Sequence, residues 1–312
     1  MSQTAFLFPG QGSQYVGMGR NLYEAYPEAR TTFDQANEVL GFALSDLCFN
    51  GPEETLNDTI NTQPAIFVTS VALLKVLESN RLQAPGFVAG HSLGEYSALA
   101  AAGAMDFAAG LQLVRERGRL MKEAGERSPG GMAAVLGLEA EAVDEVCRQA
   151  REETGGVIQV ANYNSPGQIV ISGDFRTRDV AIELAKAAGA RRVVPLAVSI
   201  AAHSPLMECI ADEFRQAVEA TEFRRPTVPV VANVSAAPLE SVEALREELV
   251  QQLTSPVRWV ESIRYMTGQG VTKFVEIGPK DVLTRLMKRI DKSVPAMSVG
   301  DVTGVKSLTE SR

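Results

Sequence analysis

Short apolar runs rich in β-branched residues alternate with longer amphipathic stretches along most of this chain. Such an alternation is typical of a parallel β-sheet whose strands are connected by helices. Each run ends near Gly, Pro, Asn or Ser, as strands commonly do. The runs that we predict as strands are 4–8, 86–89, 193–198, 228–232, 273–277 and 294–299. The sequence therefore predicts an α/β fold, with functional residues in the loops that follow the strands.

Three further stretches predict two helices and a tail. Apolar residues recur every four positions across 206–218, which predicts one helix that begins just after His203. Residues 62–77 are apolar on nearly every side and have Pro64 near their start, which predicts a buried core helix. The polar, unpatterned residues 303–312 predict a loose tail.

The pattern changes between residues 128 and 197. After a Pro-Gly-Gly sequence we predict strands 132–137, 157–162, 168–172 and 191–196 and helices 139–153 and 175–188. This β-α-β-β-α-β order is the ferredoxin-like one, and about seventy residues suffice for it. Because the segment begins and ends inside the larger α/β pattern, we expect an inserted subdomain at 128–197. A cleft between the two parts is then the expected place for a site.

Composition excludes several classes of protein. With 45% hydrophobic and 22% charged residues, the 312-residue chain is not disordered. A net charge of -8 argues against nucleic acid as a partner, because phosphate contacts dominate that binding. The longest apolar stretch, 66–77, is shorter than the roughly 20 residues of a membrane span. We therefore expect no membrane or nucleic-acid function.

The chain start and the cysteines predict a cytoplasmic protein. Residues 2–17 carry no charge and so lack the basic region of a signal peptide. The three cysteines, Cys48, Cys147 and Cys209, lie far apart, which fits neither a metal site nor a disulfide framework. We expect all three to be reduced thiols.

The sequence Gly90-His91-Ser92-Leu93-Gly94 matches the G-x-S-x-G nucleophile elbow. It follows an apolar predicted strand and precedes a predicted helix, which is the structural context that the motif needs. Glycines are required on both sides because the serine occupies a strained turn. The motif predicts Ser92 as a nucleophile.

A serine nucleophile needs a base within hydrogen-bonding reach, and the chain has only two histidines. His91 is adjacent to Ser92, and neighbours on a sharp turn diverge. His203, between a predicted strand and a predicted helix, is therefore the candidate base. In an α/β-hydrolase an acid would fall between Ser92 and His203, but no Asp or Glu there stands in a recognisable loop motif. This pattern is compatible with a dyad whose histidine is oriented by a backbone or amide carbonyl.

Two further groups complete the candidate site. An oxyanion hole needs two main-chain N–H groups, which Leu93 and the glycine-rich loop around Gln11 are placed to supply. That loop lacks the Lys-Ser/Thr ending of a phosphate-binding loop, so nucleotide binding is a weaker alternative. Arg117 precedes Gly118, whose presence inside a predicted helix suggests close packing. A guanidinium held in a cleft would bind a carboxylate, so we expect an acidic substrate.

These residues together resemble the malonyl-CoA:acyl carrier protein transacylases of type II fatty acid synthesis. The resemblance rests on Gly-Gln-Gly-Ser-Gln at 10–14, Gly-His-Ser-Leu-Gly-Glu at 90–95, Arg117-Gly118, Asn162 and His203-Ser204-Pro205-Leu206-Met207, and it extends from Phe8 to Pro279. It implies an α/β-hydrolase-like catalytic subdomain over 1–127 and 198–312 with a ferredoxin-like subdomain at 128–197.

The resemblance also implies an activity. Ser92, activated by His203, would take the malonyl group from malonyl-CoA and pass it to the phosphopantetheine thiol of acyl carrier protein. It implies that Gln11 and Leu93 form the oxyanion hole. It further implies that Arg117, His91 and Asn162 bind substrate and that the main-chain carbonyl of Gln252 orients the histidine. It implies no metal or bound cofactor, and we expect a monomer.

Alternatives to this activity remain open. Ala202 stands where many members of that family have Phe, which would leave room for an α-substituted malonyl group and a polyketide synthase acting in trans. The same elbow would also serve a thioesterase or esterase, in which water resolves the acyl-enzyme. A non-catalytic docking module is a third alternative.

Because carrier proteins are generally acidic, we expect a local basic docking patch. The candidates are Lys186, Arg191 and Arg192 in the inserted segment and Arg285, Lys288, Arg289 and Lys292 near the C-terminus.

Overall fold

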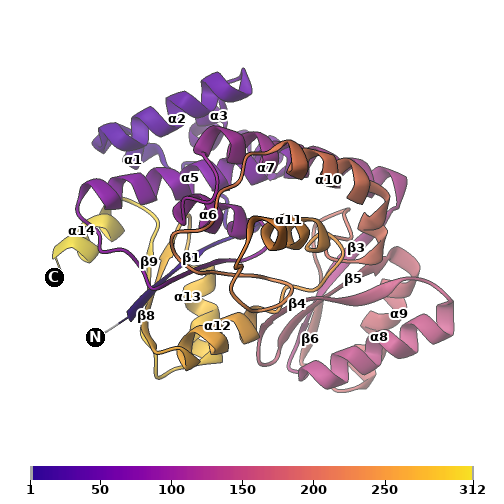
Figure 1. The fold of residues 1–312 in the computed structure, drawn as a ribbon. Coiled ribbons are helices and arrows are strands. Elements are labelled where there is room, and N and C mark those ends of the chain that lie inside the picture. The colour runs from indigo at the N-terminus through magenta and orange to yellow at the C-terminus, as the bar shows by residue number, and fades with distance from the viewer. Residues whose placement is uncertain (1–2, 311–312) are drawn as a thin grey trace.

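Two separate β-sheets form the framework of the protein (Figure 1). The computed structural model describes residues 3–310. In the larger sheet, of order β7-β2-β1-β8-β9, all paired strands are parallel. In the smaller sheet, of order β4-β5-β3-β6, all paired strands are antiparallel. The α/β fold with a parallel sheet is therefore confirmed, and the second sheet is separate from it.

The parallel sheet contains five of the six predicted runs. Its strands are β1 (Gln3–Phe8), β2 (Phe87–Gly90), β7 (Val230–Val231), β8 (Val271–Ile277) and β9 (Ala296–Val299). Run 193–198 does not belong to this sheet, and its residues are instead the strand predicted at 191–196 of the inserted segment. Its residues form β6 (Arg192–Pro195), where Val193 and Val194 pair with β3 of the smaller sheet.

Helices bury both faces of the parallel sheet. Along β1, Phe6 and Phe8 face one helical layer, whereas Ala5 and Leu7 face the other, because side chains alternate along a strand. The first layer comprises α1 (Arg20–Ala25), α2 (Pro27–Leu40), α3 (Leu44–Asn50), α4 (Glu53–Asn57), α5 (Thr59–Ser79), α6 (Gly94–Ala101), α7 (Phe107–Arg127), α10 (Ala211–Ala220), α11 (Val242–Gln251) and α14 (Val302–Glu310). The second comprises α12 (Trp259–Gly268) and α13 (Val282–Ile290).

The helix α5 is buried, as predicted, but longer than the predicted stretch. By length and composition its 21 residues could cross a membrane, yet 83% of its most apolar window is buried inside the protein. Pro64 lies in its second turn rather than at its start. Proline has no N–H to donate to the carbonyl of Ile60, and Arg115 of α7 donates to that carbonyl instead, at 2.7 Å. The arginine thus compensates for a bond that the helix lacks.

The smaller sheet has the predicted element order. It comprises β3 (Gly130–Leu136), α8 (Ala140–Thr154), β4 (Ile158–Ser165), β5 (Gln168–Asp174), α9 (Phe175–Ala187) and β6. Both helices pack on one face of the sheet. The strand β4 continues to Ser165, so only Pro166 and Gly167 connect it to β5.

Two predictions for the second half of the chain are wrong. The single helix expected after His203 begins as a 3-10 helix, η1 (Pro205–Ile210), and becomes α10 at Ala211. The tail expected at 303–312 forms α14 up to Glu310, and its last two residues lie outside the described residues. Val305 and Leu308 of α14 are buried in the main core, and these two apolar residues suffice to hold a short helix that lacks a strong sequence pattern.

The three cysteines are free, as predicted. Cys48 and Cys147 are buried, and their burial raises the pKa of each thiol to about 12. Cys209 is exposed on η1. None of the three lies in the cavity described below.

Candidate functional site

Ser92 lies on a tight turn between β2 and α6. Its φ angle is 51°, a left-handed conformation that non-glycine residues rarely adopt. A Cβ atom on Gly90 would lie 1.9 Å from the main chain of Gly94, and one on Gly94 would lie 2.0 Å from the carbonyl oxygen of Phe8. Only glycine fits at either position, so the local sequence itself produces the strained turn.

The structure brings Ser92 and His203 together although they lie 111 positions apart in the chain. The Oγ atom of Ser92 lies 2.8 Å from Nε2 of His203, and Nδ1 of His203 lies 2.7 Å from the main-chain oxygen of Gln252. A carbonyl oxygen only accepts hydrogen bonds, so Nδ1 carries the proton and Nε2 is free to accept the Ser92 proton. The main-chain oxygen of Gln252 thus orients the ring of His203, in the place where an Asp or Glu side chain would do so in a serine–histidine–acid triad.

His203 is held as a neutral base. Burial and then the nearby Arg117 cation lower its pKa to about 3, although the hydrogen bond to Gln252 acts in the opposite direction. Protonating the ring would place a second positive charge in a buried site that already holds one. The imidazole therefore stays unprotonated over the whole neutral range.

We expect acyl loading to remain nearly constant between pH 8 and pH 5. A histidine with an ordinary pKa near 6.5 would lose roughly tenfold of its basic form by about pH 5.5, whereas one lowered to about 3 loses almost none. The unfolded chain binds more protons in the window between these values, so stability should fall as the pH drops from about 6.5 toward 3. Single-turnover loading rates, with thermal unfolding at each pH, test this. A tenfold fall in rate before unfolding begins would contradict it.

The glycine-rich loop after β1 lies against the serine turn. A Cβ atom on Gly10 would lie 2.3 Å from the carbonyl oxygen of His91, so glycine permits the close approach. Thr59 donates to Oε1 of Gln11 at 3.0 Å and holds the loop from α5. Within residues 3–310, the hydrogen bonds leave the main-chain N–H groups of Gln11 and Leu93 without an acceptor. Both residues line the same cavity as Ser92.

Arg117 is a buried cation, with 2% of its surface exposed. Its Nη1 donates to Oε1 of Gln63 at 2.8 Å, and its Nη2 donates to Oε1 of Gln252 at 2.9 Å and to Oγ of Ser92 at 3.4 Å. In the part of the chain that the structure describes, no carboxylate forms an ion pair with it. Gly118 allows this burial, because a Cβ atom there would lie 2.8 Å from Thr59 O.

A cavity of about 410 Å³ contains the candidate residues. It lies between the two sheets, as expected, because Met132 of β3 and Asn162 of β4 form one wall and Ser92 the other. His91 also faces it, and Nε2 of that ring donates to Oδ1 of Asn164 at 2.7 Å. An apolar part is formed by Met121, Met132, Leu196, Val198, Ile200 and Ala202.

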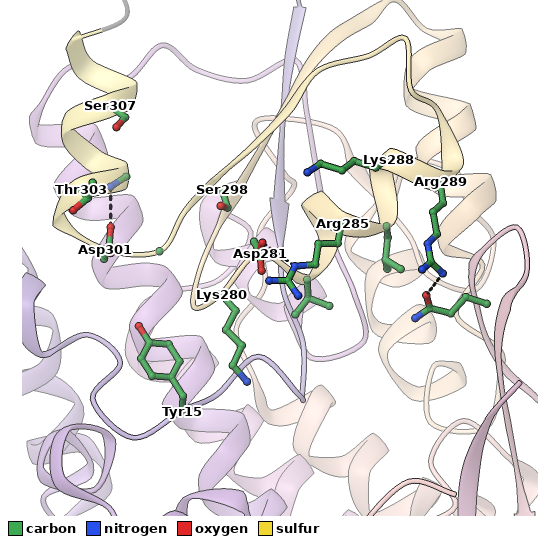
Figure 2. A pocket seen from close by; sticks show the side chains of 15 residues that line it. Tyr15, Lys280, Asp281, Arg285, Lys288, Arg289, Ser298, Asp301, Thr303 and Ser307 are labelled. Carbon is green, nitrogen blue, oxygen red and sulfur yellow. Dashed lines mark hydrogen bonds and ion pairs between the residues drawn. The ribbon is translucent and has the colours of Figure 1, made fainter. Parts of the chain in front are cut away.

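A larger cavity of about 1020 Å³ lies between the loop after β1, α13 and α14. Figure 2 shows Lys280, Arg285, Lys288 and Arg289 around it. Lys280 donates to the carbonyl oxygen of Gly12 at 3.0 Å, and Gly12 lines the cavity of Ser92. The larger cavity therefore adjoins the mouth of the smaller one. It contains three of the four basic residues of the predicted C-terminal patch.

Several positioning residues lack a sequence signal. Asn233 accepts from the N–H of Ser92 at 2.7 Å, and Gln159 donates to the carbonyl oxygens of His203 and Thr254 at 2.7 and 2.8 Å. Gln63 holds Arg117, and Glu95 contacts Gln252. Of these, only Glu95 stands next to a recognised motif. No sequence motif indicates Asn233, Gln159 or Gln63.

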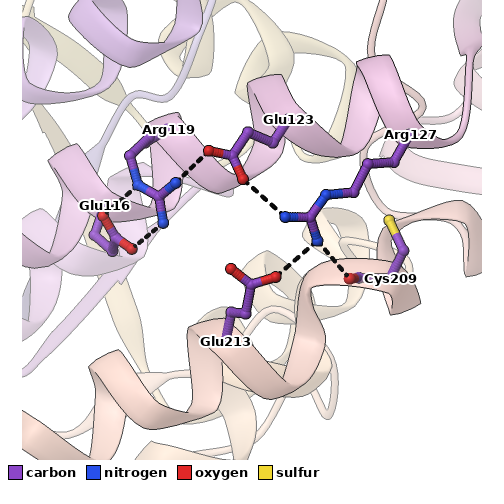
Figure 3. Close-up of polar contacts among 6 residues, drawn as sticks. All are labelled: Glu116, Arg119, Glu123, Arg127, Cys209 and Glu213. Atoms are coloured by element: carbon purple, nitrogen blue, oxygen red, sulfur yellow. Dashed lines mark hydrogen bonds and ion pairs between the residues drawn. The ribbon is translucent and has the colours of Figure 1, made fainter.

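Two other arginines of α7, Arg119 and Arg127, form ion pairs instead of lining the site. Figure 3 shows Arg119 between Glu116 and Glu123, and Arg127 linking Glu123 to Glu213 of α10. Arg127 also donates to the carbonyl oxygen of Cys209 at 3.3 Å. Exposed pairs of this kind add little stability. Their geometry nevertheless connects the helix that carries Arg117 to the segment that follows His203.

The site and fold together define an α/β protein in which a partly exposed serine contacts a buried histidine, beside a buried cation that forms no ion pair within residues 3–310. The acyl transferase domain family matches residues 5–308. Malonyl CoA-acyl carrier protein transacylase of Bacillus subtilis is 47% identical over 301 residues, 96% of this chain and 94% of that protein. The Escherichia coli K12 protein of the same name is 44% identical over 99% of this chain and its own full length.

Solved structures agree with these relatives. A type II polyketide malonyl-transacylase in complex with its acyl carrier protein has a TM-score of 0.97 at 44% identity, with all of both chains covered. An acyl carrier protein S-malonyltransferase of Vibrio cholerae has a TM-score of 0.95 at 44% identity over 98% of this chain and all of that one. The chain thus belongs to the acyl transferase domain family, among its malonyl CoA-acyl carrier protein transacylases. The resemblance inferred from the motifs is confirmed.

Proposed function

We propose that the protein is an [acyl-carrier-protein] S-malonyltransferase, which moves malonyl groups from malonyl-CoA to acyl carrier protein for fatty acid synthesis. The observation that carries the proposal is Arg117, whose buried guanidinium lies 3.4 Å from Oγ of Ser92 and lacks a carboxylate partner among the described residues. A buried charge without a partner is costly. The free carboxylate of a malonyl thioester would supply the missing charge while its thioester carbon reaches the serine.

The first half of the reaction acylates the serine. Nε2 of His203 takes the proton of Ser92, and Oγ attacks the thioester carbon. The N–H groups of Gln11 and Leu93 stabilise the oxyanion of the tetrahedral intermediate. The carbon–sulfur bond then breaks, and the coenzyme A sulfur leaves with the proton from His203. The product is a malonyl ester of Ser92.

The second half repeats these steps in reverse order. His203 takes the proton of the carrier protein's phosphopantetheine thiol, and the sulfur attacks the ester carbon of the malonyl-serine. Gln11 and Leu93 again hold the oxyanion, and His203 returns the proton to Oγ of Ser92 as that oxygen leaves. Arg117 would retain the malonyl carboxylate through both halves by two parallel hydrogen bonds, with His91 and Asn162 lining the same cavity.

The two sheets correspond to two proposed subdomains. We assign residues 1–127 and 198–312 to an α/β-hydrolase-like catalytic subdomain, of which 1–2 and 311–312 lie outside the described residues. Residues 128–197 form the proposed ferredoxin-like subdomain. The β4-β5-β3-β6 order and the two helices on one face support this assignment.

The basic residues of the larger cavity are the proposed docking patch for acyl carrier protein. Lys280, Arg285, Lys288 and Arg289 would attract an acidic carrier to the mouth of the cavity of Ser92. The alternative patch of Lys186, Arg191 and Arg192 is exposed on α9 and near β6, and Lys186 is paired with Glu183. The patch of Lys280, Arg285, Lys288 and Arg289 is favoured because it lies beside the mouth of the cavity that contains Ser92.

Reversing charge at Lys288 and Arg289 should slow transfer from the malonyl-enzyme to carrier protein by about tenfold at low salt, because steering depends on charge. The malonyl-enzyme is prepared first, so that binding of malonyl-CoA does not enter the measurement. Arg30→Glu on α2 is the control, and Arg191→Glu with Arg192→Glu tests the other patch. If either double variant keeps an unchanged apparent affinity for carrier protein, the patch that carries those two substitutions is not the docking site.

We also propose that the protein is a cytoplasmic monomer that uses no metal or bound cofactor. Within residues 3–310, no group of three or more His, Cys, Asp or Glu residues is placed to hold a metal ion. A polyketide synthase acting in trans would use the same chemistry with another carrier. The relatives' names favour transfer over the hydrolase alternative.

The intact mass of the protein after brief exposure to malonyl-CoA, methylmalonyl-CoA or acetyl-CoA tests the proposal. A malonyl adduct that passes to added carrier protein is the expected result. Preferential methylmalonyl loading would indicate polyketide supply, made possible by the space beside Ala202. Steady thioester hydrolysis without an adduct would favour the hydrolase instead.

A further inference from the structure

We propose that Glu95 is a positioning residue for recognition of the substrate carboxylate, acting through the side chain of Gln252. The inference rests on the proposed function. Glu95 lies in the first turn of α6 and is fully buried. One carboxyl oxygen, Oε2, accepts from Nε2 of Gln252, and the other, Oε1, accepts from the N–H of Asn233 at 3.3 Å. Both oxygens therefore face donors.

The amide of Gln252 has two possible orientations, and only one of them suits Arg117. In the observed orientation Oε1 accepts from Nη2 of Arg117 at 2.9 Å, while Nε2 donates to Glu95 and to the carbonyl oxygen of Ser92 at 3.2 Å. A flipped amide would turn its NH₂ group toward the guanidinium, which has only donors. Glu95 and Ser92 O select the first orientation because both present acceptors to Nε2.

This selection determines how Arg117 is held. Within residues 3–310, its guanidinium donates to the oxygens of Gln63 and Gln252 and makes a longer contact with Ser92. It also lies over the ring of Tyr96, 5.5 Å from the ring centre. Neither amide neutralises its charge, so the cation stays available for a carboxylate. If Oε1 of Gln252 no longer accepts from Nη2, the guanidinium of Arg117 can move away from the position where it would bind the substrate carboxylate. Charge-assisted hydrogen bonds of this kind give geometric specificity as well as energy.

The base is held by a different part of Gln252. Nδ1 of His203 donates to the main-chain oxygen of Gln252, which Glu95 does not touch. Disturbing Glu95 should therefore affect how Arg117 and Gln252 hold the substrate carboxylate. It should leave the hydrogen bond between Ser92 and His203 in place. Comparing acetyl with malonyl transfer therefore distinguishes positioning of Arg117 from a general structural role. Acetyl transfer needs His203 as the base, but it does not need Arg117 to bind a carboxylate.

Glu95→Gln tests the proposal. The new side chain keeps one acceptor but presents an NH₂ group to Asn233 or to Gln252, both of which are donors there. We expect kcat/KM for malonyl loading to fall about tenfold to a hundredfold, the usual range for one hydrogen bond to a charged group. Acetyl loading should change much less, because acetyl has no carboxylate for Arg117 to hold. Equal losses with both thioesters, or an unchanged malonyl-to-acetyl ratio, would overturn the inference.

Two further variants separate the possible causes. Ser97→Ala removes a buried hydroxyl from the same helix as Glu95, one without a hydrogen-bond partner within residues 3–310, and it should preserve the ratio. Gln252→Leu keeps the carbonyl for His203 and removes the amide, so it should reproduce the loss. Combining it with Glu95→Gln should add nothing further. If Glu95→Gln does not fold, a normal ratio in Gln252→Leu alone overturns the inference. Failure of the unaltered protein to load malonyl would instead contradict the proposed function.

Discussion

Replacing Ser92 by alanine is expected to abolish the malonyl adduct and to lower malonyl transfer by about 10⁴-fold or more, as removal of a nucleophile does in serine enzymes. Ser92 Oγ is the atom that contacts both Nε2 of His203 and Nη2 of Arg117, so no neighbouring hydroxyl replaces it. The measurement is intact mass after exposure to malonyl-CoA, together with the rate of transfer to carrier protein.

Ser97→Ala is the matched control for this variant. Ser97 lies on α6, the helix that follows the turn of Ser92, and its buried hydroxyl has no hydrogen-bond partner within residues 3–310. Its removal should leave the adduct and the transfer rate unchanged. An adduct that persists in Ser92→Ala would show that another residue carries the acyl group. Carrier binding and function that survive Ser92→Ala would support the docking-module alternative.

Replacing Arg117 by alanine is expected to lower malonyl loading by about 10²- to 10³-fold, the range measured when one partner of a buried charge pair is removed. Acetyl loading should fall much less, because acetyl has no carboxylate to pair. Arg117→Lys retains the charge but not the planar fork, so it should restore only part of the malonyl rate. Single-turnover loading with the two thioesters measures the ratio directly.

Stability must be measured alongside, because Arg117→Ala leaves the oxygens of Gln63 and Gln252 without their donor. Arg115→Ala is the control on the same helix. Arg115 donates to Ile60 O and to Oδ1 of Asn61, and it does not line the cavity of Ser92. It should cost stability while it preserves the malonyl-to-acetyl ratio. Equal losses for both thioesters in Arg117→Ala would count against its assigned role.

The nucleophile turn could be predicted because its determinants are local. Gly90 and Gly94 are required by contacts within a few residues of Ser92 and with β1, and the strand and helix on either side show in the sequence pattern. His203 was identified by elimination, since the chain has only two histidines. The close packing expected at Gly118 is likewise a single-residue property, and it is confirmed.

The elements that were missed depend on distant partners. The helix α14 forms because Val305 and Leu308 enter a core made by segments far earlier in the chain. The pattern also includes 193–198 among the runs of the larger sheet, although the same residues are correctly predicted as strand 191–196 of the inserted segment, where they pair with β3. Apolar periodicity does not show which core a segment enters, so 303–312 is predicted as a tail.

By itself, the sequence determined the α/β class, the strained serine turn and the short set of residues from which a site could be built. It could do so because glycine sterics and apolar periodicity act over a few neighbouring residues. Only the tertiary structure decided how those residues are oriented. Gln252 meets Ser92 across 160 positions and Asn233 meets Glu95 across 138. Hydrogen bonds between such residues depend on how the helices pack on the sheet. The pairing of a neutral His203 with a carbonyl, and the burial of an unneutralised Arg117, are therefore properties of the folded chain.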